Sequence, residues 1–349
     1  MSVTEPLLEV DGLSVEFDTP EGVVKAVRDV SWNLMPGETL GIVGESGSGK
    51  SVSVMSLMKL IPTPPGRIAA GEVRFRDRDL LKLSRFQLRR LRGKDISMVF
   101  QDPMSSLNPV QTVGRQIAEA MSVHDAKLND RDARKRAIEL LEVVGVPQPD
   151  VRFKQYPHQF SGGMRQRAMI AMAIANQPPV LIADEPTTAL DVTIQAQVME
   201  VLKDAQKEAG AAMVLITHDL GLIAEMADRV VVMYGGRVVE VGDVRTVFHQ
   251  PRHPYTFGLM ASLPRLDTQT ESLPTIPGQP PSLITPPSGC AFHPRCRLKR
   301  DRADCEEHVP PLHKVSGEHF SACHHIDEME QLIAEVSAEV GTDLTRGDT

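Results

Sequence analysis

A glycine-rich octapeptide, GESGSGKS, runs from Gly44 to Ser51 and has the composition of a phosphate site. It follows the apolar run Thr39 to Val43 and precedes a stretch typical of a helix. Glycines let successive backbone N–H groups converge on anionic oxygens, and a helix N-terminus adds partial positive charge. Lys50 is expected to reach the terminal phosphates of a nucleotide, and Ser51 to ligate Mg²⁺. The predicted nucleotide-binding residues here are Gly44, Glu45, Ser46, Gly47, Ser48, Gly49, Lys50 and Ser51.

Two later apolar runs also end in polar residues. The run from Val180 (VLIADE) ends in the adjacent acids Asp184 and Glu185, and the run from Met213 (MVLITH) ends at His218. Adjacent carboxylates would be costly in a core, but they suit a Mg²⁺ partner and a base for water. His218 is suited to polarise that water or to contact the terminal phosphate. We therefore predict Glu185 and His218 as catalytic residues.

A second anion site is predicted in QFSGGMRQR, where Ser161, Gly162 and Gly163 open a helical segment. One nucleotide does not need two such loops from a single chain. The simplest explanation is that two chains face each other, and that each lends its serine-glycine loop to the nucleotide held by the other.

The elements around these motifs alternate between strand and helix. Residues 7 to 43 read as short strands, and uninterrupted apolar runs at Ser97 to Gln101, Val180 to Glu185 and Met213 to His218 suit strands buried on both faces. Helical periodicity covers Asp130 to Val144 and Thr193 to Glu208, and a hairpin is expected at Gly235 and Gly236. This order predicts an α/β domain with a mainly parallel sheet, whose ligands gather at the carboxyl ends of the strands.

Composition narrows the class of protein. The chain has 349 residues and a formal net charge of -8, so it lacks the basic footprint of a nucleic-acid-binding protein. No apolar run is long enough to cross a bilayer, and the acidic N-terminus lacks an export pattern, which favours the cytoplasm. A basic cluster from Arg74 to Lys94 reads as a solvated face, with a lipid-headgroup or partner contact as the alternative.

The composition changes after residue 249. We predict an ATPase-type domain over 1–249, a proline-rich appendage over 250–330 and a polar, partly helical tail over 331–349. The prolines from Pro251 to Pro287 exclude regular helix or central strand over most of the segment from Gln250 to Cys290. All four cysteines, Cys290, Cys296, Cys305 and Cys323, fall in the appendage, which indicates a shared task. The options are an iron–sulfur cluster, zinc, with His293, His308, His324 and His325 as substitute ligands, or free thiols.

Together, GESGSGKS, FSGGMRQR, LIADEP, TTALD and THD resemble the ATP-binding cassette (ABC) family in order and spacing over roughly residues 6 to 245. The resemblance implies a P-loop core with an antiparallel β subdomain and a helical subdomain at about 103–170. It also implies that Asp184 supports Mg²⁺, Glu185 activates water, and Gln101 senses both Mg²⁺ and the transporter's coupling surface. Asp191 would communicate across a dimer, and Phe17 would stack on adenine.

Longer strings, QDPMSSLNP, YPHQFSGGMRQR, IPGQPPS and GCAFHPRC, resemble the ATP-binding subunits of bacterial dipeptide and oligopeptide importers. This resemblance implies ATP and Mg²⁺ as ligands, a [4Fe-4S] cluster on the cysteines and a peripheral position on the cytoplasmic face of the cell membrane. The implied partners are a homologous ATPase subunit, with a heterodimer favoured over a homodimer, two permease subunits and an extracytoplasmic substrate-binding protein. A soluble ABC ATPase of DNA repair or translation is the rival, and the cargo stays open among dipeptides, longer peptides and nickel complexes.

Overall fold

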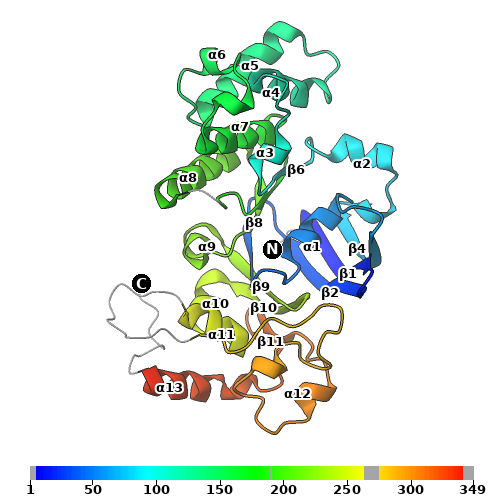
Figure 1. Cartoon of the computed structure of the whole chain (residues 1–349), viewed down its shortest axis with the longest axis vertical. Helices are drawn as coiled ribbons and strands as arrows, with labels where there is room; N and C mark the ends of the chain where they lie inside the picture. The colour runs from blue at the N-terminus through cyan, green and yellow to red at the C-terminus, as the bar shows by residue number, and fades with distance from the viewer. Residues whose placement is uncertain (1–4, 189–190, 263–274, 341–349) are drawn as a thin grey trace. The chain divides into compact units, whose positions relative to one another are not determined.

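The computed structural model describes residues 5–188, 191–262 and 275–340. Within these ranges the chain forms two compact units. The first unit contains residues up to 7, 34–39 and 82–217, and the second contains 8–33, 40–81 and 218 onwards. Figure 1 labels the elements of both units.

The first unit contains three parallel strands with buried side chains. Strand β6 (Ile96–Val99) pairs with β7 (Val180–Asp184), which pairs with β8 (Ala212–Ile216). The apolar runs therefore predicted these strands, but each strand ends one or two residues before its predicted polar end. The polar residues leave the ladder at the carboxyl edge, as Glu185 does with a φ of 45°.

Helices make up most of the rest of the first unit. Helix α5 (Asp130–Val143) and helix α8 (Val192–Ala209) confirm the two helical periodicities within a residue of their predicted ends. The others are α2 (Arg85–Leu91), α3 (Pro103–Ser106), α4 (Val113–Ser122), α6 (Pro149–Arg152) and α7 (Gly162–Ile174). Figure 1 shows α4, α5 and α7 grouped together, and the helical subdomain at about 103–170 that the resemblance implies stays a prediction.

The second unit contains two sheet regions. In the first, β1 (Leu8–Thr19), β2 (Gly22–Leu34), β4 (Gly66–Phe75) and β5 (Arg78–Asp79) lie in the order β2-β1-β4-β5, and β4 is antiparallel to both β1 and β5. In the second, β3 (Thr39–Val43) runs parallel to β9 (Arg229–Tyr234), and β9 forms the predicted hairpin with β10 (Arg237–Asp243).

The appendage is joined to this second sheet region. Strand β12 (His319–Ser321) pairs antiparallel with β10 and with β11 (His313–Ser316). Neither strand was predicted, because both are too short to show alternation. Helix α1 (Lys50–Leu57) follows the phosphate loop, and the unit also contains α9 (Leu220–Met226), α10 (Val244–His249), α12 (Asp304–Glu307) and short 3₁₀ turns.

One regular helix occurs within the proline-rich segment. Helix α11 (Pro254–Ala261) begins at Pro254, in the first turn, where a missing N–H costs nothing. His253 caps the helix by accepting a hydrogen bond from the Tyr255 N–H at its Nδ1 atom, 3.1 Å away. Pro264 and Pro274 lie outside the described residues. The predicted boundary after residue 249 stays a prediction.

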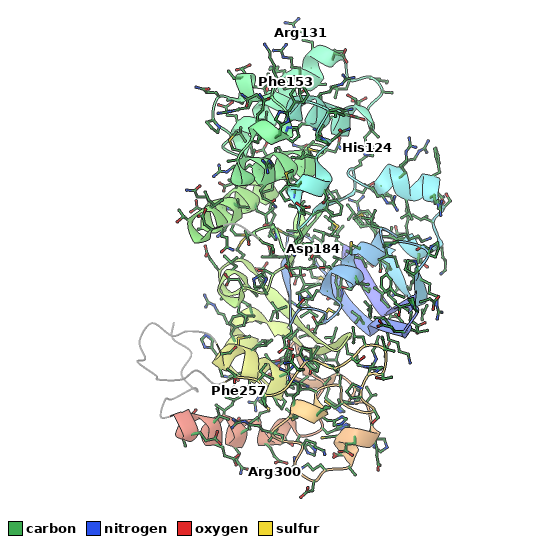
Figure 2. The ribbon with its side chains drawn as sticks, in the orientation of Figure 1. His124, Arg131, Phe153, Asp184, Phe257 and Arg300 are labelled. Atoms are coloured by element: carbon green, nitrogen blue, oxygen red, sulfur yellow. The ribbon has the colours of Figure 1, made fainter. Side chains whose placement is uncertain are left out.

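Helix α13 (Met329–Val340) begins two residues before the predicted tail and covers its first ten residues. Met329, Leu332, Ile333 and Val336 pack with Phe257, Ala261 and Leu298 in a buried apolar cluster, in which Figure 2 labels Phe257. This face anchors the tail on α11, while residues 341–349 lie outside the described ranges. None of the described helices is long and apolar enough to cross a membrane.

His253 makes the stability of this unit sensitive to pH. The side chain is buried, and burial lowers its pKa to about 3 from an ordinary value of 6.5. Below pH 6.5 the unfolded state binds a proton at this side chain, whereas the native state does so only near pH 3. The free energy of unfolding therefore falls as the pH drops from about 6.5 towards 3. At pH 5 we expect a loss of about 2 kcal/mol in the free energy of unfolding.

The measurement is chemical denaturation at pH 7.5 and pH 5 of the wild type and of His253→Asn, which keeps a capping oxygen and does not titrate. The variant should lose about 2 kcal/mol less than the wild type over this interval. His249→Asn, at an exposed site, is the matched control. Equal losses for wild type and His253→Asn would contradict the assignment.

Candidate functional site

The phosphate loop in the second unit has the backbone of an anion cradle. Gly44 has a φ of 148° and Gly49 a φ of 100°, a region that side-chain-bearing residues rarely adopt. A Cβ on Gly44 would lie 2.1 Å from the Met233 carbonyl oxygen, and one on Gly49 would lie 2.4 Å from the Ala26 carbonyl oxygen. Only glycine fits at these positions, and helix α1 begins directly after the loop at Lys50.

Lys50 is held over its own loop. Its side chain is 5% exposed, and Nζ donates to the carbonyl oxygens of Gly44 at 2.8 Å and Glu45 at 3.1 Å. These contacts hold the ammonium group against the backbone of the loop that would receive the phosphate oxygens. Ser51 follows in the first turn of α1. The backbone and the lysine thus fit the nucleotide-binding role that the sequence predicts.

Phe17 lies on β1 opposite Gly66 of β4 and is half-buried. A Cβ on Gly66 would lie 2.7 Å from its ring atom Cε1, so the glycine leaves room for the ring. The ring is partly accessible, as stacking on a base requires. His218, also in the second unit, is exposed after β8, and Asp219 caps the following helix α9.

In the first unit, Glu185 is held by hydrogen bonds to both its main chain and its side chain. Its N–H donates to the Ile216 carbonyl oxygen at 2.9 Å, which ties it to β8. Its Oε2 atom accepts hydrogen bonds from Gln101 Nε2 and from Thr188 Oγ1, each at 2.9 Å. Asp184, the last residue of β7, is 5% exposed. The structure therefore brings three predicted residues, Gln101, Asp184 and Glu185, to one edge of the parallel strands.

Ser161 and Asp191 both cap helices in the first unit. Ser161 accepts from the Met164 N–H at 3.3 Å and starts α7, and it is exposed together with Gly162. Asp191 accepts from the Ile194 N–H at 3.0 Å and starts α8. A Cβ on Gly163 would lie 2.9 Å from Ile194 Cγ2, so the two helix starts pack closely. The N-terminus of α7 is open to a partner, as an intermolecular anion site requires.

The four cysteine thiols converge. Each of the six thiol pairs is close enough that one thiol raises the pKa of the other. Burial is the main cause of the shifts, and it raises the pKa of Cys296 and Cys323 to about 12 and that of Cys305 to about 11. Burial also raises the pKa of Cys290. Without a bound cation these thiols stay protonated, so the site holds either four neutral thiols or a metal that displaces their protons.

Backbone N–H groups point at three of these sulfurs. They come from Phe292 and His293 for Cys290, from Leu298 and Lys299 for Cys296, and from His325 for Cys323. Such contacts stabilise thiolates. Among the described residues, the only group of three ligand atoms within 4.8 Å of one another is Asp304, Cys305 and His325.

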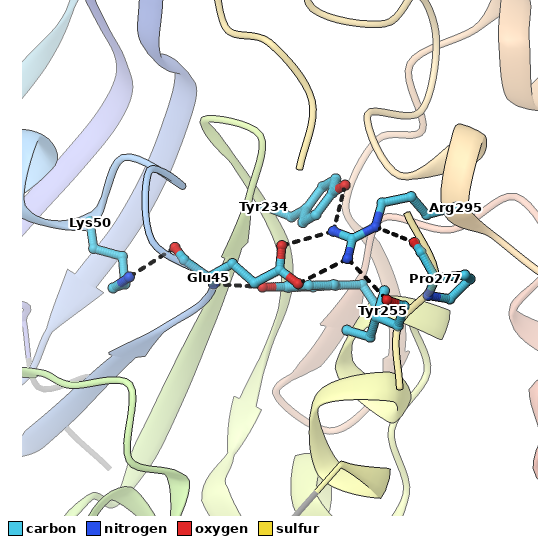
Figure 3. A network of polar contacts seen from close by, with 7 residues as sticks. Glu45, Lys50, Tyr234, Tyr255, Pro277 and Arg295 are labelled. Carbon is cyan, nitrogen blue, oxygen red and sulfur yellow. Dashed lines mark hydrogen bonds and ion pairs between the residues drawn. The ribbon is translucent and has the colours of Figure 1, made fainter. Parts of the chain in front are cut away.

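One contact of the phosphate loop was missed at the sequence level. Glu45 was predicted only as a loop residue, but its carboxylate pairs with Arg295 and its N–H donates to the Tyr255 hydroxyl (Figure 3). Both partners lie more than 200 positions away, and no local pattern in the sequence connects them to the loop.

Comparison with known proteins places the chain in a family. A family model for ABC transporters matches residues 27–188, and a model for the oligopeptide/dipeptide transporter C-terminal region matches residues 239–305. An oligopeptide transport ATP-binding protein of Bacillus subtilis is 54% identical over 315 residues, covering 90% of this chain and 87% of that protein. The chain belongs to the ATP-binding subunits of oligopeptide and dipeptide ABC importers.

Other matches of this ABC subunit agree. A dipeptide transport ATP-binding protein of Bacillus subtilis is 53% identical over 292 residues, covering 84% of this chain and 87% of that protein. Among solved structures, a dimeric ATP-binding cassette in a post-hydrolysis state with ADP and phosphate has a TM-score of 0.61 and 28% identity. The alignment covers 68% of this chain and 99% of that one. The predicted family and the predicted ABC-type α/β fold are confirmed.

Proposed function

We propose that this ABC subunit hydrolyses ATP on the cytoplasmic face of a bacterial inner membrane, as a peripheral component, and thereby drives uptake of di- or oligopeptides. The observation that carries the proposal is the identity of 54% over 90% of the chain to an oligopeptide transport ATP-binding protein. A family model for the C-terminal region of oligopeptide/dipeptide transporters also matches residues 239–305, which include part of the appendage.

The residue roles follow from the loop and the strand ends. The cradle of Gly44 to Ser51 would hold the phosphates, with Lys50 on the terminal ones, and Phe17 would stack on adenine. Ser51, Gln101 and Asp184 would hold Mg²⁺, which supplies charge neutralisation at the phosphates. Glu185, oriented by Gln101 and Thr188, would accept the proton of the attacking water, and His218 would contact that water or the terminal phosphate.

The active form would be a pair of cassettes. The exposed N-terminus of α7, capped by Ser161, supports a half-site that completes the nucleotide site of a facing cassette. The structural neighbour described above is itself a dimer. We favour a homologous but different ATPase subunit as the partner, with Asp191 near the shared interface. ATP would then favour the closed pair by its greater affinity for that state.

Two permease subunits would couple this cycle to transport. A surface groove of about 430 Å³ in the first unit supports such docking. The groove is lined by Arg92, Gly93, Ser106, Asn108, Gln111, Gln116, Glu119, Ala120, Val123, His124, Met172 and Asn176. Its lining lies on the segments that flank Gln101 in sequence and on the helices that follow. A helix of a permease seated there would sense the state of Gln101, and an extracytoplasmic binding protein would deliver the peptide.

We also propose that Cys290, Cys296, Cys305 and Cys323 hold a [4Fe-4S] cluster. Thiolates bound to a single zinc ion at about 2.3 Å would lie roughly 3.8 Å apart. Among the described residues, the one group of three ligand atoms that is this compact contains a single cysteine, Cys305. Convergent but wider thiols with N–H donors to sulfur suit a larger cluster. When bound, the cluster would cross-link segments of the appendage that share little regular secondary structure.

Metal analysis of the full chain, purified without oxygen, tests this assignment. We expect roughly four iron and four acid-labile sulfide per chain, together with visible absorption that bleaches on reduction. Cys323→Ser should lose this absorption, whereas Asp304→Asn should keep it. If the chain instead contains zinc and no sulfide, and Asp304→Asn or His325→Asn loses the zinc, the metal site is the group of Asp304, Cys305 and His325 rather than a cluster on the cysteines. If the four cysteines react as free thiols and no metal is found, both the cluster and the zinc site are contradicted.

Purification of the tagged chain from membranes tests the transport role. We expect a second ATPase subunit and two permeases to copurify, and we expect cells that lack the chain to lose uptake of labelled peptides. Copurification with nucleic acid or ribosomes from the soluble fraction would favour a soluble ABC ATPase instead.

A further inference from the structure

The phosphate loop is bound from the side of the appendage by a buried arginine. Arg295 ends a 3₁₀ turn (His293–Arg295) between Cys290 and Cys296. Its Nη1 atom lies 2.8 Å from Glu45 Oε2, and its Nη2 atom lies 3.2 Å from Glu45 Oε1 (Figure 3). This is a two-point contact, the geometry in which an arginine fixes both the place and the plane of a carboxylate.

Arg295 is itself immobilised by the appendage. Nε donates to the Pro277 carbonyl oxygen at 2.7 Å, and Nη1 donates to the Tyr234 hydroxyl at 3.2 Å. The side chain is 6% exposed, against 24% for Glu45. An ion pair whose arginine is buried differs from a surface pair, because removal of the carboxylate leaves the buried charge without compensation. The contact is therefore a fixed point between the appendage and the loop.

A second contact holds the backbone of the same glutamate. The Glu45 N–H donates to the hydroxyl of Tyr255 at 2.7 Å, and Tyr255 is fully buried on α11. Tyr255 packs against Tyr234 with ring centroids 4.5 Å apart, and both rings pack against Phe292 of the appendage. Thus both the side chain and the main chain of Glu45 are fixed by a cluster that includes the residues around Cys290 and Cys296.

Glu45 in turn is part of the cradle, because its carbonyl oxygen accepts from Lys50 Nζ at 3.1 Å and from the Ser48 N–H at 3.2 Å. We infer that Arg295 is a positioning residue for the phosphate loop, through which the cysteine-bearing appendage sets the affinity for nucleotide. The inference rests on the proposed function, since it concerns how the loop that binds ATP is held. Release of Glu45 leaves the loop with more conformations, and the fraction competent for phosphate falls.

The test compares variants of the full chain by calorimetric binding of a non-hydrolysable ATP analogue. We expect Arg295→Gln to weaken binding about 10-fold, because a smaller fraction of the loops is competent to bind phosphate. Arg295→Lys retains the charge but not the two-point contact, and it should keep part of the wild-type affinity. Glu45→Gln should weaken binding similarly, and the double variant should be no weaker than either single one, because the two residues act as one unit.

The matched control is Arg302→Gln, which breaks another appendage ion pair, 2.7 Å from Glu328, three residues before Cys305. It should leave both binding and amide hydrogen exchange of residues 44–50 unchanged, whereas Arg295→Gln should speed that exchange. Equal binding by Arg295→Gln and wild type, or an equal loss in Arg302→Gln, would overturn the inference. If Arg295→Gln does not fold, the inference is tested by comparing the binding of the ATP analogue to Glu45→Gln and to Arg302→Gln. No binding by the wild type would instead remove the proposed function.

Discussion

Glu185→Gln is expected to bind ATP as tightly as the wild type and to turn it over at least about 100-fold more slowly, the range of a lost general base. The amide has the shape of the carboxylate and can still accept hydrogen bonds from Gln101 and Thr188, so the surrounding structure should persist. What it cannot do is accept a proton from water. The measurements are phosphate release under saturating ATP and equilibrium binding of ATP with Mg²⁺, both made with the partner subunit present.

Two variants of the same unit separate the chemistry from general damage. Thr188→Val removes the threonine's hydrogen bond to Glu185 Oε2 without changing side-chain size, and should slow turnover only about 10-fold, since an orienting bond is worth about 1 to 2 kcal/mol. Glu142→Gln changes an exposed acid on α5 and should have no effect. Turnover by Glu185→Gln close to that of the wild type would remove Glu185 from its assigned role.

The sequence predicts the elements of the site well, because their physical signals are local. Short apolar runs become β7 and β8, and a glycine loop before α1 becomes the cradle. A helix cap is also local, so the start of α7 at Ser161 could be found from a serine followed by two glycines. The resemblance to ABC proteins then assigned roles to residues whose positions these local signals had fixed.

Contacts between distant segments could not be predicted in this way. The hydrogen bond from Gln101 to Glu185 joins two strand ends, and its formation depends on a backbone φ of 45° at Glu185 that no propensity indicates. The Glu45 to Arg295 ion pair spans 250 positions and exists because the appendage packs on Tyr234 and Tyr255. The convergence of the cysteines was expected from their shared segment, but their spacing in sequence does not give the spacing of the sulfurs.

Proline content did not indicate the helix α11 in the appendage, for a related reason. A proline excludes helix only in the interior, and Pro254 stands at a start with His253 as its cap. The apolar faces of α11 and α13 then stabilise each other, which neither segment indicates alone. Pairing between segments, rather than composition, decides whether such a region becomes ordered.

Ser161→Arg should lower ATP hydrolysis by the assembled pair about 100-fold or more and leave ATP binding to the isolated chain nearly unchanged, because one lost transition-state anion contact is worth about 3 kcal/mol. Ser161 is exposed at the start of α7, so a longer cationic side chain can be accommodated without disturbing the core. In a facing pair, however, the same side chain would occupy the space where the phosphate of the partner's nucleotide must approach the helix N-terminus.

Loss of the cap is a separate effect, and it has a matched control. Asn129 caps α5 in the same unit by accepting from the Asp132 N–H at 3.0 Å, so Asn129→Ala costs a similar amount, about 1 kcal/mol, without touching the proposed half-site. It should hydrolyse ATP normally. Light scattering measures ATP-dependent pairing, and each variant is made in the Glu185→Gln background to prevent turnover. Pairing should fail for Ser161→Arg and persist for Asn129→Ala. Normal hydrolysis and pairing in Ser161→Arg would mean that each nucleotide is cleaved without the α7 start of a second chain.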